Sequence, residues 1–541
     1  MKVFREYKRL NLTEVAESVR QRWESEKTFE LSVEGRKNCP PFVFYEGPPS
    51  ANGLPGIHHV MARTIKDIFC RYKTQKGFLV QRKAGWDTHG LPVELAVEKE
   101  LGITKEDIGV KISIADYNRK CREAVMRYTS EWESLTEKMG YWVDMKDPYI
   151  TFDNKYIESV WWLLRKLYDK GLLYKGYSIQ PYSPKAGTGL SSHELNLPGC
   201  YRDVQDQTVT AQFKIIKNEQ SNFLFENADG DLNTDVYFLA WTTTPWTLPS
   251  NTALAVGPNI DYLRVETLNR FTKERNVVLL AKNLLGKHFA PECWVNPDED
   301  WEDEVQKYLD NKRKHPPARK LLSHFKNDEN LTANGSNDLN SSNEHELYFK
   351  GIELTGLRYE QLLPFAQPMD DPTAAFRVIA GNFVTTEDGT GIVHIAPTFG
   401  ADDMNVAREA GVPSMLVPDS EGNPTPIVDK QGRFVKQMGP YAGKYVKNEY
   451  YPDGDAPEKS VDVELMIQLV EEGKCFSKEK YVHNYPHCWR TDKPVLYYPL
   501  DSWFIKSSAI KERMMELNDT INWKPASTGT GRFAEWLKNL H

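Results

Sequence analysis

Cysteine is scarce in this sequence and never paired. The 541 residues contain seven cysteines, no two of which are spaced as Cys-x-x-Cys. Zinc sites built on thiolates need such pairs, so we expect no metal site in this stretch. An odd number of scattered thiols also differs from a disulfide framework and indicates reduced cysteines in a cytoplasmic protein. The seven are Cys39, Cys70, Cys121, Cys200, Cys293, Cys475 and Cys488.

Long hydrophobic runs and an excess of positive charge are missing as well. No segment approaches the ~18 apolar residues that cross a bilayer, and the opening MKVFREYKRLNL lacks the apolar core of a signal peptide. We therefore expect a cytoplasmic protein with no membrane partner. With 68 Lys and Arg against 76 Asp and Glu, the formal net charge is -8. That balance disfavours nucleic-acid binding by overall charge but allows a local basic groove.

Apolar and aromatic residues, in contrast, are plentiful. Hydrophobic residues make up 40% of the chain and aromatic residues 12%, which supplies enough apolar surface for large packed cores. At about 100 to 200 residues per domain, the length predicts roughly three domains. A wholly disordered chain is excluded.

The first part of the chain has the order of elements of a mononucleotide-binding unit. An N-x-x-E capping pattern at Asn11 and Glu14 predicts an opening helix. Residues 42–45 then form a β-rich run ending in a Gly-Pro-Pro turn, residues 59–76 have helical periodicity, and residues 78–81 predict a further strand. This βαβ order is the front half of a Rossmann-type domain, so we expect an α/β fold.

Beyond Cys200 the pattern changes to short strands, for example at 208–213 and 236–241, which predict a second, β-rich domain. Helical patterning returns from residue 441, as at 461–472, and indicates a return to the first domain. The expected domains are a helical extension at 1–40, the first half of the Rossmann-type domain at 41–200, the β-rich insertion at 201–440 with a polar, disorder-prone surface segment at 310–347, and the returning part at 441–541.

The Gly/Pro-rich loop before the second predicted helix is a candidate phosphate site. It reads PPSANGLPG and is followed by Ile57-His58-His59. A loop between a strand and a helix N-terminus presents free N–H groups and a positive dipole end to an anion. By itself the loop is as compatible with a structural turn as with a functional site.

With its histidines, this segment resembles the HIGH signature of the class I aminoacyl-tRNA synthetases. The signature's histidines stabilise the charge that builds on the α-phosphate when a carboxylate attacks ATP. His59 matches the final histidine, whereas Gly56 stands where the first would be, so His58 is a weaker candidate than His59. The resemblance implies catalytic roles for Asn52, Gly53, Gly56, His58 and His59.

Two more segments resemble the amino-acid pocket of the isoleucine enzymes of that family. The string GWDTHGLP places Asp87 where the family's aspartate receives the substrate's α-ammonium group, for which a carboxylate is the suitable partner. The segments NYPHCWR and DSWF resemble the strand that completes the pocket, where Trp503 would line the side-chain site. Pro48 is expected at the same pocket. An ordinary turn aspartate and an ordinary core tryptophan are the structural alternatives.

An apolar pocket cannot strongly reject a substrate that is one methylene smaller. The difference, a generalisation drawn from this enzyme family itself, is about 1 to 3 kcal/mol, and a second, hydrolytic site is the family's solution. The string WTTTPWTLPSN resembles the family's Thr-rich editing motif, and Pro245-Trp246 is its isoleucine form, where valine and leucine relatives carry Arg-Pro-Glu or Arg-Pro-Asp. The editing candidates in this string are Thr242, Thr243, Thr244, Trp246 and Asn251.

The second half of the predicted editing site is GTGIVHIAP followed by GADD. In the family, the histidine at the place of His394 lies beside the ester, and the aspartate at the place of Asp403 binds the α-ammonium of the misattached amino acid. The nine-residue spacing from His394 favours Asp403 over Asp402. For an isolated Asp-Asp pair, a helix N-cap would be the better interpretation.

The resemblance therefore predicts an isoleucine-tRNA ligase of the class I family: a Rossmann-type catalytic domain interrupted by a large β-rich editing domain. Its expected substrates and partners are isoleucine, ATP with Mg²⁺, and tRNA(Ile), and a monomer is expected. Zinc would belong only to later regions of the family, and the chain is expected to end before the KMSKS loop and the anticodon-binding region. The alternatives are an editing hydrolase alone, a valine or leucine relative, and a non-enzymatic RNA-binding protein.

Overall fold

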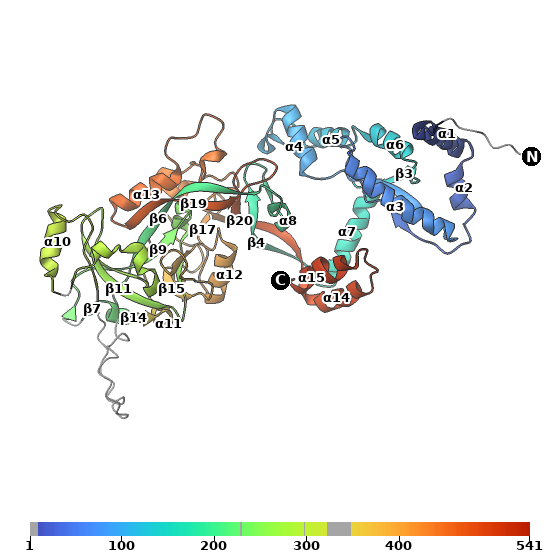
Figure 1. Ribbon diagram of the computed structural model, residues 1–541. Helices are drawn as coiled ribbons and strands as arrows, with labels where there is room; N and C mark the ends of the chain where they lie inside the picture. The colour runs from blue at the N-terminus through green and yellow to red at the C-terminus, as the bar shows by residue number, and fades with distance from the viewer. Residues whose placement is uncertain (1–8, 228–229, 297, 322–347, 541) are drawn as a thin grey trace, which may run out of the picture. The chain divides into compact units, whose positions relative to one another are not determined.

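The computed structural model describes residues 9–227, 230–296, 298–321 and 348–540. The chain divides into two compact units (Figure 1). Unit 1 comprises Met1–Tyr174 and Trp503–His541, and unit 2 comprises Lys175–Ser502. Among the described residues, none of the helices has the length and apolar character needed to span a membrane.

Unit 1 contains a parallel sheet with strand order β1-β2-β3, flanked by helices. The connection from β1 to β2 is the single long helix α3, and three helices connect β2 to β3, so the unit has the predicted α/β class. The elements are α1 Leu12–Ser25, α2 Thr28–Glu34, β1 Phe44–Tyr45, α3 Ile57–Gln75, β2 Arg82–Trp86, α4 Leu91–Leu101, α5 Ile114–Val125, α6 Thr129–Lys138, β3 Asp144–Ile150, α7 Asn154–Asp169, α14 Lys511–Asp519 and α15 Ala534–Lys538.

Local signals set two helix ends of unit 1 as the sequence predicts. The Asn11 side chain accepts a hydrogen bond from the backbone N of Glu14 at the start of α1. Helix α3 stops just before Gly77, whose φ of +87° is a backbone conformation that favours glycine.

The strand predicted at 78–81 is wrong, because the paired strand begins directly after this segment. The paired strand is β2 at Arg82–Trp86, while Leu79 makes only an isolated bridge to Pro41. The paired strand is the part that meets both neighbours, β1 at Arg82–Lys83 and β3 at Gly85–Trp86, and a Cβ at Gly85 would lie 2.3 Å from Tyr149 Cζ of β3. Because Arg82 and Lys83 are charged, this segment lacks the apolar pattern that predicts a strand.

Unit 2 is built on a seven-stranded sheet with the order β13-β11-β12-β9-β6-β19, in which β14 also pairs with β11. A smaller sheet has the order β15-β10-β16, and another the order β20-β4-β5. The strands are β4 Leu173–Ser183, β5 Thr188–Gly189, β6 Tyr201–Lys214, β7 Glu226–Asn227, β8 Gly230–Asp231, β9 Val236–Thr242, β10 Ala253–Val256, β11 Asp261–Leu268, β12 Arg275–Ala281, β13 Ala318–Lys320, β14 Tyr348–Lys350, β15 Arg377–Ala380, β16 Ile392–Ile395, β17 Leu416–Pro418, β18 Pro424–Pro426, β19 Cys475–Pro486 and β20 Leu496–Ile505.

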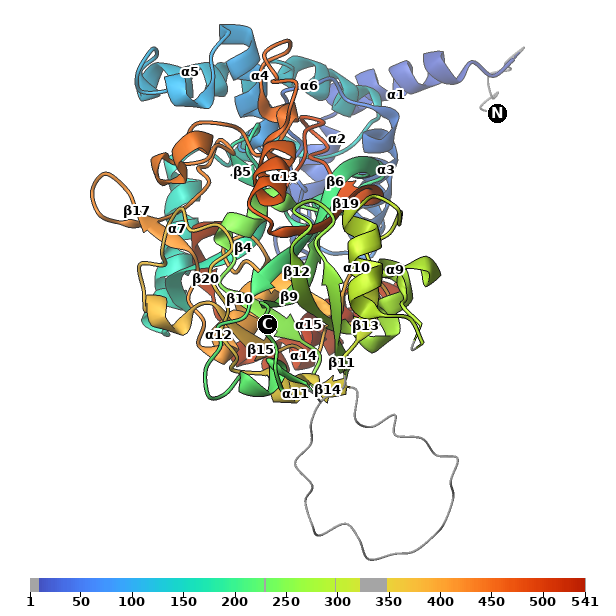
Figure 2. The ribbon, with the colours of Figure 1, turned by 90° about the vertical axis from the view of Figure 1, so that its left-hand side faces the viewer.

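The helices of unit 2 are short and lie around these sheets (Figure 2). They are α8 Ser192–Leu195, the 3-10 helix η3 Pro245–Ser250, α9 Leu285–His288, α10 Trp301–Leu309, α11 Gly351–Leu354, α12 Ala401–Ala410 and α13 Val461–Glu471. Helix α13 contacts β6, β19 and η3. Fully buried side chains such as Phe213 and Phe238 form the main core between the sheets, each contributing roughly 1.5 to 3 kcal/mol from burial.

The compact units divide the chain at other positions than the predicted boundaries at 200/201 and 440/441. Strands β6 and β19 form a long antiparallel pair, with Cys475 opposite Ala211 and Pro486 opposite Tyr201. That pairing ties the segment after 441 to the β-rich unit. Within the predicted surface segment 310–347, β13 pairs with β11, and residues 322–347 lie outside the described residues.

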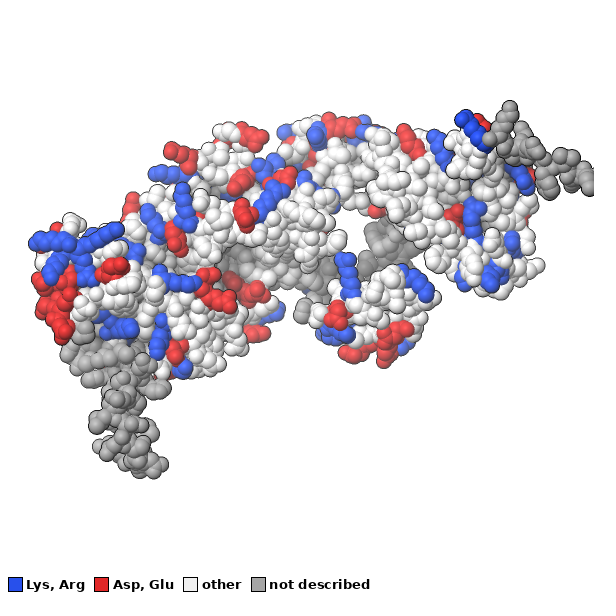
Figure 3. Space-filling view, viewed as in Figure 1, with Lys and Arg blue, Asp and Glu red and all other residues white. Residues whose placement is uncertain are grey.

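Lys, Arg, Asp and Glu side chains are intermixed on the face of unit 2 that Figure 3 shows. On α10, for instance, Lys307 lies 2.6 Å from Glu304, and Asp303 is a further ion-pair partner. Basic residues therefore do not form a continuous patch on that face.

Candidate functional site

The threonine string of unit 2 forms the turn between β9 and η3. Thr242 is the last residue of β9, and the backbone N of Thr244 donates to Thr242 Oγ1 at 3.1 Å. Helix η3 begins at Pro245, for which the missing N–H suits the first helical position. All six residues of η3 are buried. Contacts with the protein rather than with water therefore set the orientation of its side chains.

Three hydroxyls and an imidazole lie in series across this turn. Thr242 Oγ1 is 3.3 Å from Thr244 Oγ1, which is 3.4 Å from Thr247 Oγ1. Thr247 Oγ1 in turn is 3.1 Å from His394 Nε2, and it donates to the Thr244 carbonyl at 2.8 Å. We call Thr242, Thr244 and Thr247 the hydroxyl series. It brings two predicted segments into contact, although they lie some 150 residues apart in the chain.

Thr247 was missed as a candidate from the sequence. The signal was present, because Thr247 belongs to the same string and follows Thr244 by three residues, which is about one turn of a 3-10 helix. Thr243, which was predicted, is partly exposed and makes no side-chain hydrogen bond to the described residues.

His394 is held in its neutral form. It projects from β16, which pairs with the buried strand β10. Burial lowers the pKa of His394 to about 4, so the imidazole is uncharged at neutral pH and able to exchange a proton. Its Nδ1 atom is buried and has no hydrogen-bond partner among the described residues.

Asp403 lies close to the same strand end. It stands in the first turn of α12, and its Oδ2 accepts a hydrogen bond from the backbone N of Ala396 at 2.8 Å. Gly400 is required there, because a Cβ at that position would lie 2.7 Å from Asp403 Cγ. Burial raises the pKa of Asp403. Asp402, by contrast, is exposed.

Asn251 and Trp246 serve the framework of the turn. The Asn251 amide donates to the Ala253 carbonyl at 2.8 Å, and its oxygen accepts from the Tyr359 hydroxyl at 2.7 Å. Trp246 is 3% exposed and packs edge-on against Phe399, with ring centroids 5.1 Å apart. Both side chains are thus engaged in packing around the site.

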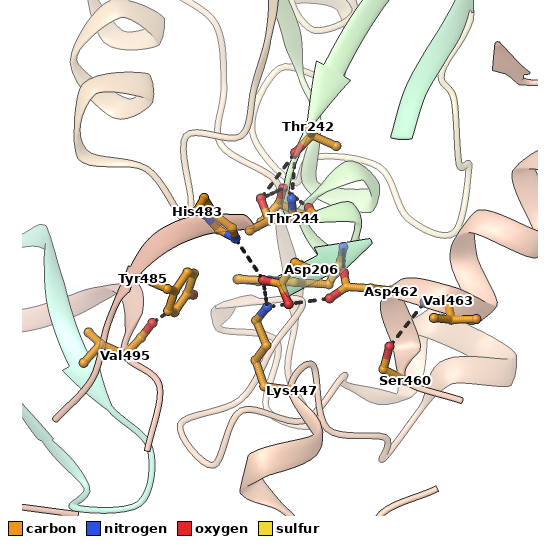
Figure 4. Close-up of polar contacts among 12 residues, drawn as sticks. Asp206, Thr242, Thr244, Lys447, Ser460, Asp462, Val463, His483, Tyr485 and Val495 are labelled. Atoms are coloured by element: carbon orange, nitrogen blue, oxygen red, sulfur yellow. Dashed lines mark hydrogen bonds and ion pairs between the residues drawn. The ribbon is translucent and has the colours of Figure 1, made fainter. Parts of the chain in front are cut away.

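A buried cluster of charges adjoins this turn (Figure 4). Asp462 Oδ1 accepts a hydrogen bond from the Trp246 backbone N at 2.8 Å. Lys447 Nζ lies 3.8 Å from Asp462 Oδ2 and 3.0 Å from Asp206 Oδ2, and His483 Nε2 lies 3.1 Å from the same Asp206 oxygen. The four charged or titratable residues of the cluster lie outside the motifs, so the sequence offers no signal that brings them together. They are Asp206, Lys447, Asp462 and His483.

In unit 1, the loop after β1 leads directly into α3 and carries His58 and His59 in the first helical turn. The backbone N of Gly56 donates to His59 Nδ1 at 2.9 Å, so in the neutral ring the proton is on Nε2. Burial, with the neighbouring His58, lowers the pKa of His59. Its ring also stands edge-on to Trp132, with centroids 4.7 Å apart, while His58 is exposed.

Hydrogen bonds to its carbonyl groups join this loop to the segment after β2 and to α6. The Asp87 N donates to the Pro49 carbonyl at 2.9 Å, and the Trp132 indole donates to the Gly53 carbonyl at 2.9 Å. These bonds bring Asp87 beside the segment of Pro48. Asn52 is partly exposed, and its Oδ1 accepts from Ser50 Oγ at 3.1 Å.

Trp503 is the last candidate residue of the predicted amino-acid pocket. It lies on β20 with 63% of its surface exposed. Among the described residues it makes no hydrogen bond or ring contact with Pro48 or Asp87. A search of the described residues for clusters of His, Cys, Asp and Glu that could hold a metal ion finds none.

The chain is similar to known tRNA synthetases over nearly its whole length. Residues 18–541 match the protein family described as "tRNA synthetases class I (I, L, M and V)". The chain is 56% identical over 574 residues to the isoleucine–tRNA ligase of Bacteroides thetaiotaomicron, an alignment covering 100% of this chain and 46% of that protein. It is 57% identical over 543 residues to the isoleucine–tRNA ligase of Cytophaga hutchinsonii, covering 98% and 45%.

The chain thus spans about half the length of the curated relatives that it matches. Among solved structures, a LeuRS–tRNA–LeuAMS ternary complex from Agrobacterium radiobacter K84 overlaps 87% of this chain and 49% of that chain. The overlap has 16% sequence identity and a TM-score of 0.28.

Proposed function

The chain belongs to the class I tRNA synthetases of the isoleucine, leucine, methionine and valine group, and we propose from this that it is the catalytic and editing part of an isoleucine-tRNA ligase. Two arguments support isoleucine within the group. The relatives named above are isoleucine–tRNA ligases at 56% and 57% identity, and Pro245-Trp246 follows the threonines where the valine and leucine forms carry an arginine.

The observation that carries the proposal is the contact of the hydroxyl series with a neutral His394. In the proposed reaction, the tRNA ester of valine lies beside these groups and a water molecule attacks its carbonyl carbon. The ester C–O bond breaks and the tRNA 3′ oxygen leaves with a proton. A neutral imidazole suits this proton transfer, and the carboxylate of Asp403 is the suitable partner for the valine ammonium group.

The proposed synthetic reaction uses the groups of unit 1. MgATP is a substrate there, and its phosphates would lie at the loop before α3, with the Nε2–H of His59 available to the developing negative charge. Asp87 would bind the ammonium group of isoleucine, and Pro48 and Trp503 would contact its side chain. The amino-acid carboxylate then attacks the α-phosphorus, and pyrophosphate leaves.

The groups of the proposed hydrolytic site all come from one compact unit. The hydroxyl series, His394 and Asp403 all lie in unit 2 and are already in contact or close along the backbone. An editing hydrolase without synthetic activity is therefore the second candidate function. The joined loops of Pro49 and Asp87 in unit 1 argue against it, because hydrolysis has no use for them.

The test compares hydrolysis of valyl-tRNA(Ile) and isoleucyl-tRNA(Ile) by the purified chain. We expect the valyl ester to be cleaved selectively. Asp403→Asn retains the acceptor for the Ala396 N–H but removes the negative charge that would bind the ammonium group, so it should abolish hydrolysis of the valyl ester. Asp402→Asn, an exposed neighbour on the same helix turn, is the matched control and should behave like the wild type.

Cleavage of both esters at equal rates would show that the site does not select valine, and no cleavage of either would overturn the hydrolytic part of the proposal. Isoleucine-dependent exchange of pyrophosphate into ATP, measured in the longest natural form of the protein, tests the synthetic part separately. Its presence excludes the hydrolase-only alternative.

A further inference from the structure

The start of η3 is capped by a residue from far along the chain. Thr244, which precedes the helix, makes no side-chain cap, and the first helical residue is a proline. The first N–H available is that of Trp246, and it donates to Asp462 Oδ1 at 2.8 Å. A carboxylate that accepts from a helix N-terminal N–H forms a charge-assisted bond, stronger than one between neutral groups.

Asp462 is not needed to cap its own helix. It is the second residue of α13, and Ser460 Oγ already accepts a hydrogen bond from the Val463 N at that end. The Asp462 side chain instead points away from α13 toward η3 and Lys447, as Figure 4 shows. The Asp462 carboxylate therefore caps η3 rather than its own helix α13.

A buried carboxylate is costly unless it is paired, and the structure provides the pair. Asp462 is 6% exposed and Lys447 is likewise 6% exposed. Burial opposes the charge on Lys447, but Asp462, Tyr485 and Asp206 raise its pKa above the ordinary value. Burial raises the pKa of Asp462 to about 6, with Lys447 and the Trp246 N–H opposing the rise.

The lysine is itself held from a second side. Lys447 Nζ lies 3.0 Å from Asp206 Oδ2 on β6, and His483 on β19 contacts the same oxygen. Because β6 and β19 are paired strands of the main sheet, the cluster connects the turn to that sheet. The chain of contacts runs from the sheet through Lys447 and Asp462 to Trp246.

We propose that Asp462 is a positioning residue for the hydrolytic site, and that Lys447 keeps its carboxylate in place. By fixing the Trp246 N–H, Asp462 sets the start of η3 and thereby the place of Thr247, whose hydroxyl must reach His394. Asp462 touches neither the substrate nor the reacting atoms and acts through the turn. The inference rests on the proposed hydrolytic function and adds a residue to that site.

Two substitutions separate the hydrogen bond from the charge. Asp462→Ala removes the acceptor, whereas Asp462→Asn retains an oxygen that can accept from the Trp246 N–H. We expect Asp462→Ala to lower kcat for valyl-tRNA(Ile) hydrolysis about ten- to hundredfold with little change in KM, and Asp462→Asn to restore most of the loss. Glu266→Gln, a buried ion-paired carboxylate on β11, is the control and should leave kcat unchanged.

Hydrogen exchange of the amides in residues 244–251 provides a readout that does not depend on activity. Asp462→Ala should speed exchange at Trp246 and Thr247, and Asp462→Asn and Glu266→Gln should not. Equal exchange in Asp462→Ala and the wild type overturns the inference. So does an equal loss of kcat in the alanine and asparagine variants.

The role of Lys447 has its own test. Lys447→Met leaves the Asp462 carboxylate buried without its cation, so it should lower the melting temperature more than the double variant Lys447→Met/Asp462→Asn does. A double variant at least as unstable as Lys447→Met contradicts that role. If the wild type cleaves neither ester, the proposed function fails, and the exchange and melting measurements still decide whether Asp462 fixes the turn.

Discussion

The two candidate sites are held in different ways. In unit 2 the site is a series of side chains in contact, which runs from Thr242 to His394 and in which Thr242 and Thr247 are buried. In unit 1 the loop before α3 is held through its backbone, by bonds such as that from the Asp87 N to the Pro49 carbonyl. Its candidate side chains stand partly or fully exposed.

This difference suits the two proposed reactions. Selective hydrolysis needs a fixed geometry around one small amino acid, and contacting side chains supply it in advance. A loop held by its backbone leaves its N–H groups and side chains free for a large ligand such as a nucleotide. If this comparison is correct, single side-chain changes in unit 2 should disable hydrolysis alone, and changes in unit 1 should disable activation alone.

The largest effect is expected at His394. We predict that His394→Gln, which retains a polar side chain of similar size but no titratable ring, lowers valyl-tRNA(Ile) hydrolysis about a thousandfold, within the range for loss of a general acid or base. Isoleucine-dependent pyrophosphate exchange should be unaffected. A variant that loses both activities equally would contradict the separation of the two sites.

The counterpart in unit 1 is a comparison of two adjacent histidines. His59 is fixed by the Gly56 N–H at its Nδ1 atom, which leaves the Nε2–H to donate, whereas His58 is exposed. We predict that His59→Ala lowers pyrophosphate exchange about a hundredfold and that His58→Ala lowers it much less, with hydrolysis unchanged in both. If His58→Ala has the larger effect, the catalytic histidine of the loop has been misassigned.

Motif strings supplied the candidate site residues and the family because each string is local. The hydrogen bond from the Glu14 N to Asn11 and the end of α3 before Gly77 also follow from signals within a few residues. The fold class and the family could therefore be read from the sequence. The contact between Thr247 and His394 could not, because it depends on the pairing of β10 with β16, a long-range event.

The dependence on long-range contacts also explains why the charged cluster and the position of β2 could not be predicted. Asp206, Lys447 and Asp462 are common residue types in ordinary local surroundings, and only the pairing of β6 with β19 and the packing of α13 bring them together. The strand at Arg82–Trp86 was misplaced for a related reason: one of its partner strands is β3, which lies far along the chain. Local pattern carries no information about such partners.

A smaller effect should distinguish the hydroxyl series from the surrounding framework. Thr247→Val retains the shape of the side chain but removes the hydroxyl that contacts His394, and we predict about a tenfold loss of hydrolysis. Thr252→Val is the matched control, because the Thr252 hydroxyl is also buried and has no hydrogen-bond partner among the described residues. That change should leave the rate unaltered and stability equal or improved.

The smallest effect is on stability and follows from the lowered pKa of His394. An unfolded histidine takes up a proton near pH 6.5, but the folded protein takes it up only near pH 4. Between those values the unfolded state binds more protons, so stability falls as pH is lowered from 6.5 toward 4. Relative to His394→Gln, the wild type should therefore lose about 1 kcal/mol of unfolding free energy between pH 7.5 and 5.5, as measured by urea denaturation. An unchanged difference would mean that His394 is solvated in the folded state, and the contrast between a hydrolytic site of contacting side chains and a synthetic loop held by its backbone would lose this support.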